Sequence, residues 1–299
     1  RKLESAFARI VNPDSQQTLD EMTSSRFIST LERAAFTDAF EFNRRLGATV
    51  NAKGGRYTLS AGVFGDNLEE DSLKEGLAAA ARATFNPVKT DDTIVHLGGS
   101  LRYRQTGDTQ VDFRYRQRPV SHIPGRIIST GRIADSDFFI GAEAAAIHKI
   151  FWAAGEYGVT FADCNAAAAC IGDPTLDGAY GELGVFLGGK RGYKGGAFNR
   201  PGIDTPVSKG GKGALALVAH FDTIDLSGAG VDGGGYDSYT LGAEWWATKY
   251  THVGVNLFKV DADLGGETSG LDSNFAALVT SGVRNEDVTG VIVRAQFDF

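Results

Sequence analysis

Arginines recur at every second position in two neighbouring stretches of the chain, LRYRQ and FRYRQRP, which flank a TGD turn. In extended backbone, side chains two residues apart point to the same side and lie roughly 7 Å apart, so such a run forms a row of guanidinium groups. Each guanidinium can give two parallel hydrogen bonds to an oxyanion and stays charged at every physiological pH. The run therefore predicts an anion-binding pore lining; the alternative is a solvated loop face or an attachment point for lipopolysaccharide phosphates. Its members are Arg102, Arg104, Arg114, Arg116 and Arg118.

Arg26 and Arg33 lie in a second candidate stretch, DEMTSSRFISTLERAAFTDAF. If this stretch folds into a lumen, it narrows the pore and brings both arginines near a passing anion. Ser24 and Ser25 can donate hydrogen bonds to an oxyanion, or they can cap a short helix over residues 27–36. The sequence leaves both roles open.

A glycine-rich connection, residues 190–212, carries six basic side chains against a lone Asp204. Ordering so long a segment costs conformational entropy, so an ordered conformation needs packing contacts with the inside of the barrel. Arg191, Lys194 and Arg200 are therefore expected to fold at least partly inside the adjoining mouth of a barrel, as a secondary basic group.

Cys164 and Cys170 are the only cysteines, and both lie in the loop FADCNAAAACIGDP. In an oxidising compartment they can form a local disulfide, which is the prediction; the alternative is a pair of unbridged small residues in an alanine-rich loop. Two thiols without a histidine cluster are too few ligands for a structural zinc site. No metal or cofactor is expected.

Carboxylates at inward-facing positions, such as Glu143, Glu156 and Glu182, could mimic the paired acids of a hydrolase. No histidine or nucleophile has motif spacing around them, so the sequence does not predict an enzyme. Their expected role is that of countercharges to the arginines. The net charge of -7 describes the field of the whole chain rather than the lining of one channel.

The closing segment, residues 290–299, sets Val291 and Val293 on one face and Ile292 and Arg294 on the other. One face suits lipid and the other water, which is the period-two pattern of a transmembrane strand. The same alternation recurs along the chain, and 39 glycines and 19 phenylalanines suit strands joined by tight turns. No segment approaches the ~20 apolar residues of a membrane-spanning helix. The eleven predicted strands are 46–52, 57–64, 77–86, 95–104, 138–147, 151–161, 179–187, 215–222, 239–247, 253–261 and 290–299.

The connections between these strands alternate in length, as in outer-membrane barrels with short periplasmic turns and long extracellular loops. An odd number of strands cannot close an antiparallel barrel in lipid, so strands are expected to be missing and the natural chain to begin before Arg1. Two regions are predicted. Residues 1–44 form an inward-folding extracellular loop region that can include the end of a preceding strand near 6–11, and residues 45–299 form the barrel strands, with an arginine-rich loop at 106–135 and a long periplasmic connection at 190–212.

The chain contains TSSRFISTLERAAFTDAF, RRLGATV, YTLSAGVFGDN, HLGGSLRYRQ, RGYKGGAFNRP and GVIVRAQFDF. Together these stretches resemble the phosphate-selective porin O/P family, almost throughout the chain from Asp20 onward. The resemblance implies an all-β, transmembrane antiparallel β-barrel of sixteen strands, of which about eleven are covered here. It implies a homotrimer in the bacterial outer membrane, in contact with lipid and lipopolysaccharide.

The resemblance also implies ion transport by passive diffusion of small anions, such as phosphate or pyrophosphate, through an anion channel lined with arginine. Two alternatives stay open: a general-diffusion porin without phosphate specificity, and a structural outer-membrane barrel that anchors surface material. No nucleic-acid partner is expected. The residues carried over as ladder candidates are Arg102, Arg104, Arg114, Arg116 and Arg118, with Arg26 and Arg33 in second place.

Overall fold

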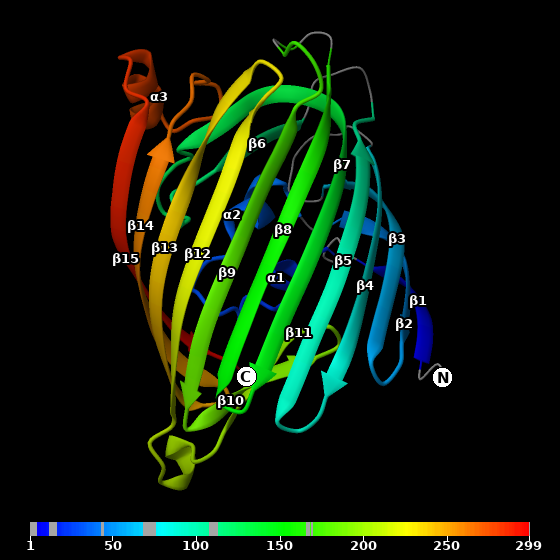
Figure 1. Cartoon of the computed structure of the whole chain (residues 1–299), viewed down its shortest axis with the longest axis vertical. Helices are drawn as coiled ribbons and strands as arrows, with labels where there is room; N and C mark the ends of the chain where they lie inside the picture. The colour runs from blue at the N-terminus through cyan, green and yellow to red at the C-terminus, as the bar shows by residue number, and fades with distance from the viewer. Residues whose placement is uncertain are drawn as a thin grey trace.

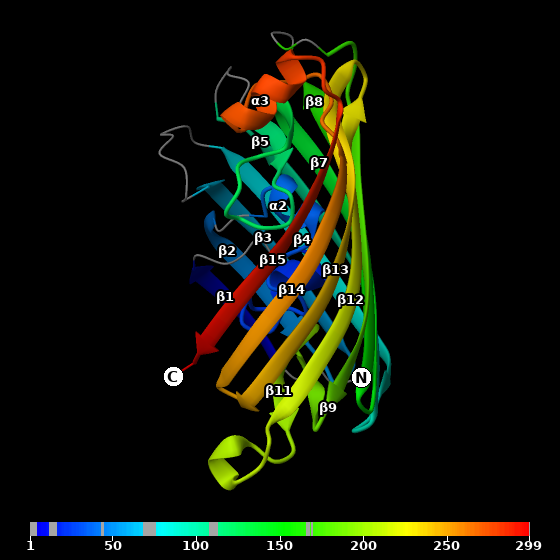
Figure 2. The same ribbon diagram turned by 90° about the vertical axis from the view of Figure 1, so that its left-hand side faces the viewer.

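One large antiparallel sheet dominates the computed structural model (Figure 1), which describes residues 5–11, 17–42, 45–67, 76–107, 113–165, 168 and 170–298. Its strands follow the order β1-β2-β3-β4-β5-β7-β8-β9-β12-β13-β14-β15, and β6 pairs with β7 outside this path. Within the described residues, β1 and β15 each pair on one side only. The sheet curves, so that it has a concave inner face and a convex outer face (Figure 2).

From β4 onward, each strand of this path has at least 13 residues, more than the about 9–11 that cross a bilayer at a tilt. The path consists of β1 (Ser5–Val11), β2 (Arg45–Lys53), β3 (Tyr57–Asn67), β4 (Leu77–Lys89), β5 (Thr93–Gln105), β7 (Ile128–His148), β8 (Phe151–Cys164), β9 (Thr175–Leu187), β12 (Ala214–Gly228), β13 (Val231–Thr248), β14 (Thr251–Asp263) and β15 (Asn285–Phe297). The smaller elements are α1 (Leu19–Met22), α2 (Ala35–Ala39), β6 (Phe113–Gln117), β10 (Gly189–Lys194), β11 (Ala197–Ile203), the 3₁₀ turn η1 (Val207–Lys209) and α3 (Ser273–Thr280).

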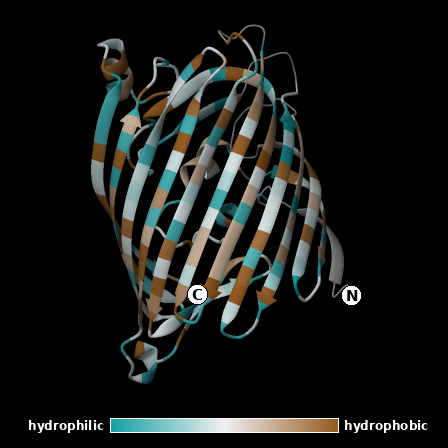
Figure 3. Cartoon of the chain, viewed as in Figure 1, coloured by the Kyte–Doolittle hydropathy of each residue, from teal (hydrophilic) through white to brown (hydrophobic). Residues whose placement is uncertain are grey.

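Exposure alternates along the strands as the period-two pattern predicts, and hydrophobic and hydrophilic residues are interspersed along the ribbon (Figure 3). On β13, the outward Leu241 is 63% exposed, whereas the inward Trp246 is 1% exposed. Each of the eleven predicted segments falls on an observed strand, although β15 ends at Phe297. The predicted all-β antiparallel fold is therefore confirmed. The strand β1 lies where the end of a preceding strand was expected.

The ends of the sheet differ in their connections. The turns after β2, β4, β7 and β13 are short, and they define what we name the short-turn end. At the opposite, long-loop end, most connections are longer, but β12 and β13 are joined by only Ala229 and Gly230. Both of these residues have positive φ, 47° and 84°, as the tight turn of a two-residue hairpin requires.

The alternative in which Ser24 and Ser25 cap a helix over residues 27–36 is wrong. A helix forms earlier instead, at α1, where the Thr18 hydroxyl oxygen accepts a hydrogen bond of 3.1 Å from the Glu21 N–H. Residues 27–34 form bends and irregular backbone, which side chains from other strands hold in place, as described below. Among the described helices, none is long and apolar enough to cross a membrane.

Two segments lie on the concave side of the sheet (Figures 1 and 2). Residues 17–42, here called the inner segment, carry α1 and α2. Residues 189–203, here called the mouth hairpin, consist of β10 and β11 and lie at the short-turn end. This hairpin falls within the stretch that the sequence presents only as a long connection. We call the large sheet the wall. The inner segment and the mouth hairpin both lie on its concave side.

Candidate functional site

The inner segment is tied to the wall through the N-terminus of α1. Glu156 on β8 accepts hydrogen bonds of 2.6 Å from the backbone N–H groups of both Leu19 and Asp20. The first N–H groups of a helix lack partners within it and carry partial positive charge, so a carboxylate is a favourable partner. Tyr180 donates a further bond of 2.9 Å to the same carboxylate. Glu156 therefore positions the backbone of α1, and in the described part of the chain it forms no ion pair with an arginine, contrary to the expected role as a countercharge.

Three other wall strands hold the inner segment in the same way. Asp222 on β12 accepts a bond of 2.6 Å from the Ala35 N–H, the first of α2. Glu182 on β9 accepts a bond of 2.6 Å from the Ser29 hydroxyl. Arg294 on β15 donates to the Leu31 carbonyl at 3.1 Å. The path of the inner segment is thus fixed by side chains that come from far along the chain.

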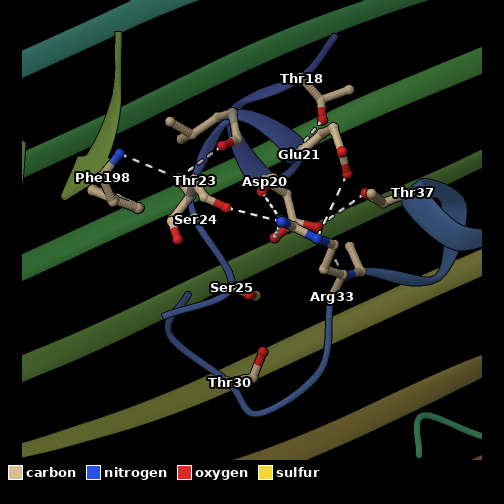
Figure 4. Close-up of polar contacts among 12 residues, drawn as sticks. Thr18, Asp20, Glu21, Thr23, Ser24, Ser25, Thr30, Arg33, Thr37 and Phe198 are labelled. Carbon is tan, nitrogen blue, oxygen red and sulfur yellow. Dashed lines mark hydrogen bonds and ion pairs between the residues drawn. The ribbon is translucent and has the colours of Figure 1, made fainter. Parts of the chain in front are cut away.

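Arg33 is engaged within the inner segment itself (Figure 4). Its guanidinium donates to the carbonyl oxygens of Asp20 and Thr23, the latter at 3.0 Å, and it forms an ion pair with Glu21 at 3.6 Å. Burial raises the pKa of Asp20, and the positive charge of Arg33 opposes that shift. In this arrangement Arg33 closes the loop between α1 and α2.

Arg102 and Arg104 point inward, as their strand parity predicts, but they are covered. Their exposed fractions are 1% and 0%. Asp137 on β7 lies 2.7 Å from Arg104 Nη2 and 3.4 Å from Arg102 Nη2. Arg102 also donates to the Phe40 carbonyl at 2.7 Å, and Arg104 forms an ion pair of 2.9 Å with Glu41. These two arginines hold the inner segment to β5 and β7, and both side chains are buried there.

Arg114 and Arg116 lie on one face of β6, and Arg118 directly follows the strand; all three are partly exposed, whereas the intervening Tyr115 and Gln117 are buried. The buried pair locks the strand in place: the Tyr115 hydroxyl donates to Asp137 at 2.7 Å, and the Gln117 amide donates to the Ala35 carbonyl at 2.8 Å. The alternation of β6 thus presents guanidinium groups on one side and anchors on the other.

Arg126 joins this face from the loop after β6, and the sequence did not single it out. Its Nη1 donates to the Arg116 carbonyl at 3.0 Å and to Gln117 Oε1 at 3.2 Å. Burial, followed by the positive charges of Arg114 and Arg126, lowers the pKa of Arg116 to about 10, so the group remains charged at neutral pH. We name these four side chains the arginine row: Arg114, Arg116, Arg118 and Arg126.

Arg26 lies at the other side of the inner segment, near the short-turn end, and its side chain is 52% exposed. Its Nη1 is 4.0 Å from Asp298, whereas Arg200 of the mouth hairpin is 2.9 Å from the same carboxylate. Both guanidinium groups lie over the ring of Phe27, at 5.2 and 5.0 Å from its centroid. Two arginines therefore share one carboxylate and one aromatic ring here.

The other basic residues of the mouth hairpin occupy different environments. Arg191 is buried, donates to the Ser29 hydroxyl at 2.7 Å and lies 4.4 Å from the centroid of Phe198. Lys194 is exposed, next to the hairpin turn. The turn itself reaches the opposite wall, where Arg82 on β4 donates to the Gly196 carbonyl at 2.6 Å. Arg82 also pairs with Glu143 at 2.5 Å, a countercharge of the kind that the sequence predicts.

A disulfide joins Cys164 and Cys170 in the connection between β8 and β9. The neighbouring backbone is tied to other loop bases, since the Asn165 N–H donates to the Ile133 carbonyl at 2.9 Å and the Ile171 N–H donates to the Ala229 carbonyl at 2.9 Å. The described part of the chain contains no group of three His, Cys, Asp or Glu side chains that could hold a metal ion.

Replacing both cysteines by serine should loosen this connection while leaving ion conductance unchanged. The short loop that the bond closes corresponds to about 2 kcal/mol in the chain-entropy treatment, and its described backbone is tied by hydrogen bonds to Ile133 and Ala229. Limited proteolysis of the folded protein checks this: the serine variant, or the reduced protein, should be cut faster between β8 and β9. Equal cutting rates with and without reductant would contradict it.

The comparisons with known proteins agree with this architecture. The chain is 34% identical over 261 residues to an uncharacterized protein of Caulobacter vibrioides, an alignment that covers 82% of this chain and 52% of that relative. It thus spans about half the length of the curated relative that it matches. The sequence profile of the phosphate-selective porin O and P family matches residues 12–299, nearly the whole chain, and the chain belongs to that family.

Proposed function

We propose that the chain forms part of an outer-membrane porin through which small anions, such as phosphate or pyrophosphate, diffuse passively along the arginine row. The observation that carries this proposal is the split between two sets of arginines. Arg102 and Arg104 are buried, whereas Arg114, Arg116 and Arg118 are partly exposed. Family membership supports a channel in the outer membrane.

Fixed guanidinium groups suit this task for a physical reason. A narrow passage strips part of the water shell from an anion, and hydrogen-bond donors that are already in place offset the loss. Alternate residues of β6 are roughly 7 Å apart, so an anion can move from one guanidinium to the next without a deep energy minimum at any of them. In the proposed orientation the long-loop end is extracellular. An anion would meet the arginine row first and the pair Arg26 and Arg200 last.

The assembly belongs to the same proposal. A sheet whose edge strands β1 and β15 pair on one side only leaves backbone groups without partners in lipid, which favours completion into the sixteen-stranded barrel of the family. Exposed apolar side chains on the strands, such as Leu183, Leu241 and Val293, favour contact with outer-membrane lipid. The homotrimer and the lipopolysaccharide contacts are proposed on family membership alone.

The test is the current through the full-length protein in planar lipid bilayers. In a potassium chloride gradient, the reversal potential should lie on the chloride side of zero, and inorganic phosphate added at constant chloride should reduce the chloride current. A channel that prefers potassium and ignores phosphate would refute the proposal.

One observation favours the general-diffusion alternative. The inner segment carries more acids than bases, and these acids face the same interior: Asp20, Glu21, Glu32, Asp38 and Glu41 stand against Arg26 and Arg33. A lumen of mixed charge would pass ions with weak selectivity. In the same bilayer measurement, that channel would show a reversal potential near zero and no block by phosphate. A structural barrel would show no current at all.

A further inference from the structure

The inner segment places one of its own carboxylates in the arginine row. Asp38 Oδ2 lies 2.5 Å from Arg126 Nη1 and 3.5 Å from Arg118 Nη1. His122 Nε2 is 3.9 Å from the same oxygen, so the surroundings of this oxygen are basic. The side chain of Asp38 is 22% exposed, which leaves it accessible from the solvent that bathes the row.

The helix that carries Asp38 cannot move away easily. The adjacent Phe36 and Phe40 are fully buried in an aromatic cluster, in which the Phe40 ring lies 6.0 Å from Phe139 between centroids. The Asp222 carboxylate holds the first N–H of α2, as described above. The carboxylate is therefore presented to Arg118 and Arg126 by a rigid support rather than by a mobile loop.

An oxygen with two guanidinium groups within 3.5 Å occupies the position that an oxygen of a bound oxyanion would take. We infer that Asp38 is a tethered counter-anion of the arginine row, which competes with the transported anion for Arg118 and Arg126 and so sets how tightly the row holds it. This inference rests on the proposed function. Because repulsion grows with the charge of the solute, Asp38 weakens the retention of doubly charged phosphate more than that of chloride.

The test compares phosphate block in three forms of the full-length protein in planar bilayers: unchanged, Asp38→Asn and Asp38→Glu. The measured quantity is the concentration of inorganic phosphate that halves the chloride current. Asp38→Asn should lower it roughly fivefold, the order expected for removing one charge about 5 Å from a dianion in screened water. Asp38→Glu, which keeps the charge, should stay close to the unchanged protein.

Asp237→Asn is the matched control, since it removes one negative charge from the outer face of β13, where the side chain is exposed. It should leave the phosphate block unchanged, and heat-modifiable electrophoretic mobility checks that all variants are folded. If phosphate blocks the unchanged channel and Asp38→Asn matches Asp237→Asn, the inference is overturned while the proposed function stands. If the unchanged channel is neither anion-selective nor blocked by phosphate, both are overturned. An Asp38→Asn channel that is leakier to all ions, with unaltered block, assigns Asp38 a purely structural role and also overturns the inference.

Discussion

Replacement of Arg114, Arg116 and Arg118 together by alanine should turn an anion-preferring channel toward cation preference while leaving the protein folded. Two of the side chains lie on β6 and Arg118 directly follows it; all three are partly exposed, and the strand is anchored by its other face through Tyr115 and Gln117. Their loss should lower the chloride-to-potassium permeability ratio roughly tenfold or more, since about 1.4 kcal/mol of differential stabilisation gives that factor. The reversal potential across a salt gradient measures it.

A matched variant separates the position of these charges from their number. Lys53, Lys209 and Lys212 are exposed at the short-turn end, and their joint replacement by alanine changes the net charge by the same amount. This control should keep the anion preference. Equal shifts in the two triple variants, with both folded by heat-modifiable mobility, would show that the arginine row lies outside the path of the ions.

The wall could be predicted from sequence because a barrel strand repeats one local rule. Each lipid-facing residue alternates with an inward one, so the pattern of Leu241 against Trp246 can be read without knowing the neighbouring strands. The same parity placed Arg102 and Arg104 on the inner face. The alternation along a strand does not reveal which part of the chain packs over an inward side chain. Here the inner segment packs over Arg102 and Arg104.

The inner segment itself could not be predicted, because distant residues decide its path. Its N–H groups at Leu19 and Ala35 are bound by Glu156 and Asp222, which lie 137 and 187 positions along the chain. No local propensity contains that information, and the helix over residues 27–36, one of two alternatives that the sequence left open, does not form. The inward acids were expected to be countercharges to the arginines, but a buried carboxylate can equally be satisfied by backbone N–H donors, as Glu156 and Asp222 are.

The role of Arg126 was also beyond a period-two argument. It follows β6 after a bend and reaches the row by donating to the Arg116 carbonyl, so its spacing from Arg118 carries no strand parity. The mouth hairpin shows the opposite case. Its length and composition, rich in glycine and basic residues, indicated that an ordered conformation needs contacts with other parts of the chain. Arg191 contacts Ser29 of the inner segment, and Gly196 contacts Arg82 of β4. The pairing of β10 with β11 was not anticipated.

Asp137→Asn should destabilise the protein far more than it changes its anion preference. Asp137 is the shared partner of Arg102 and Arg104 and also accepts the hydrogen bond of Tyr115, so it joins β5, β6 and β7 behind the inner segment. The isosteric amide removes the negative charge. It leaves Arg104 with the Glu41 carboxylate and Arg102 with the Phe40 carbonyl. Breaking a buried ion pair on one side typically costs about 3–5 kcal/mol. The temperature at which heat-modifiable mobility is lost should fall, and the conductance should become larger and noisier as the inner segment detaches.

A combined variant tests whether Arg102 and Arg104 act in structure rather than in conduction. With Asp137→Leu, Arg102→Met, Arg104→Met and Tyr115→Phe together, the buried charges and the hydroxyl bound to them are all removed, while Glu41, which loses Arg104, has a side chain that is 21% exposed. Apolar side chains of similar volume often replace such a network with little change in stability. This variant should regain thermal stability relative to Asp137→Asn and keep the chloride preference, because the arginine row on β6 is untouched. Asp237→Asn is the control for Asp137→Asn, since each removes one negative charge. Loss of anion preference in the combined variant, with its folding restored, would place Arg102 and Arg104 in the conduction path after all.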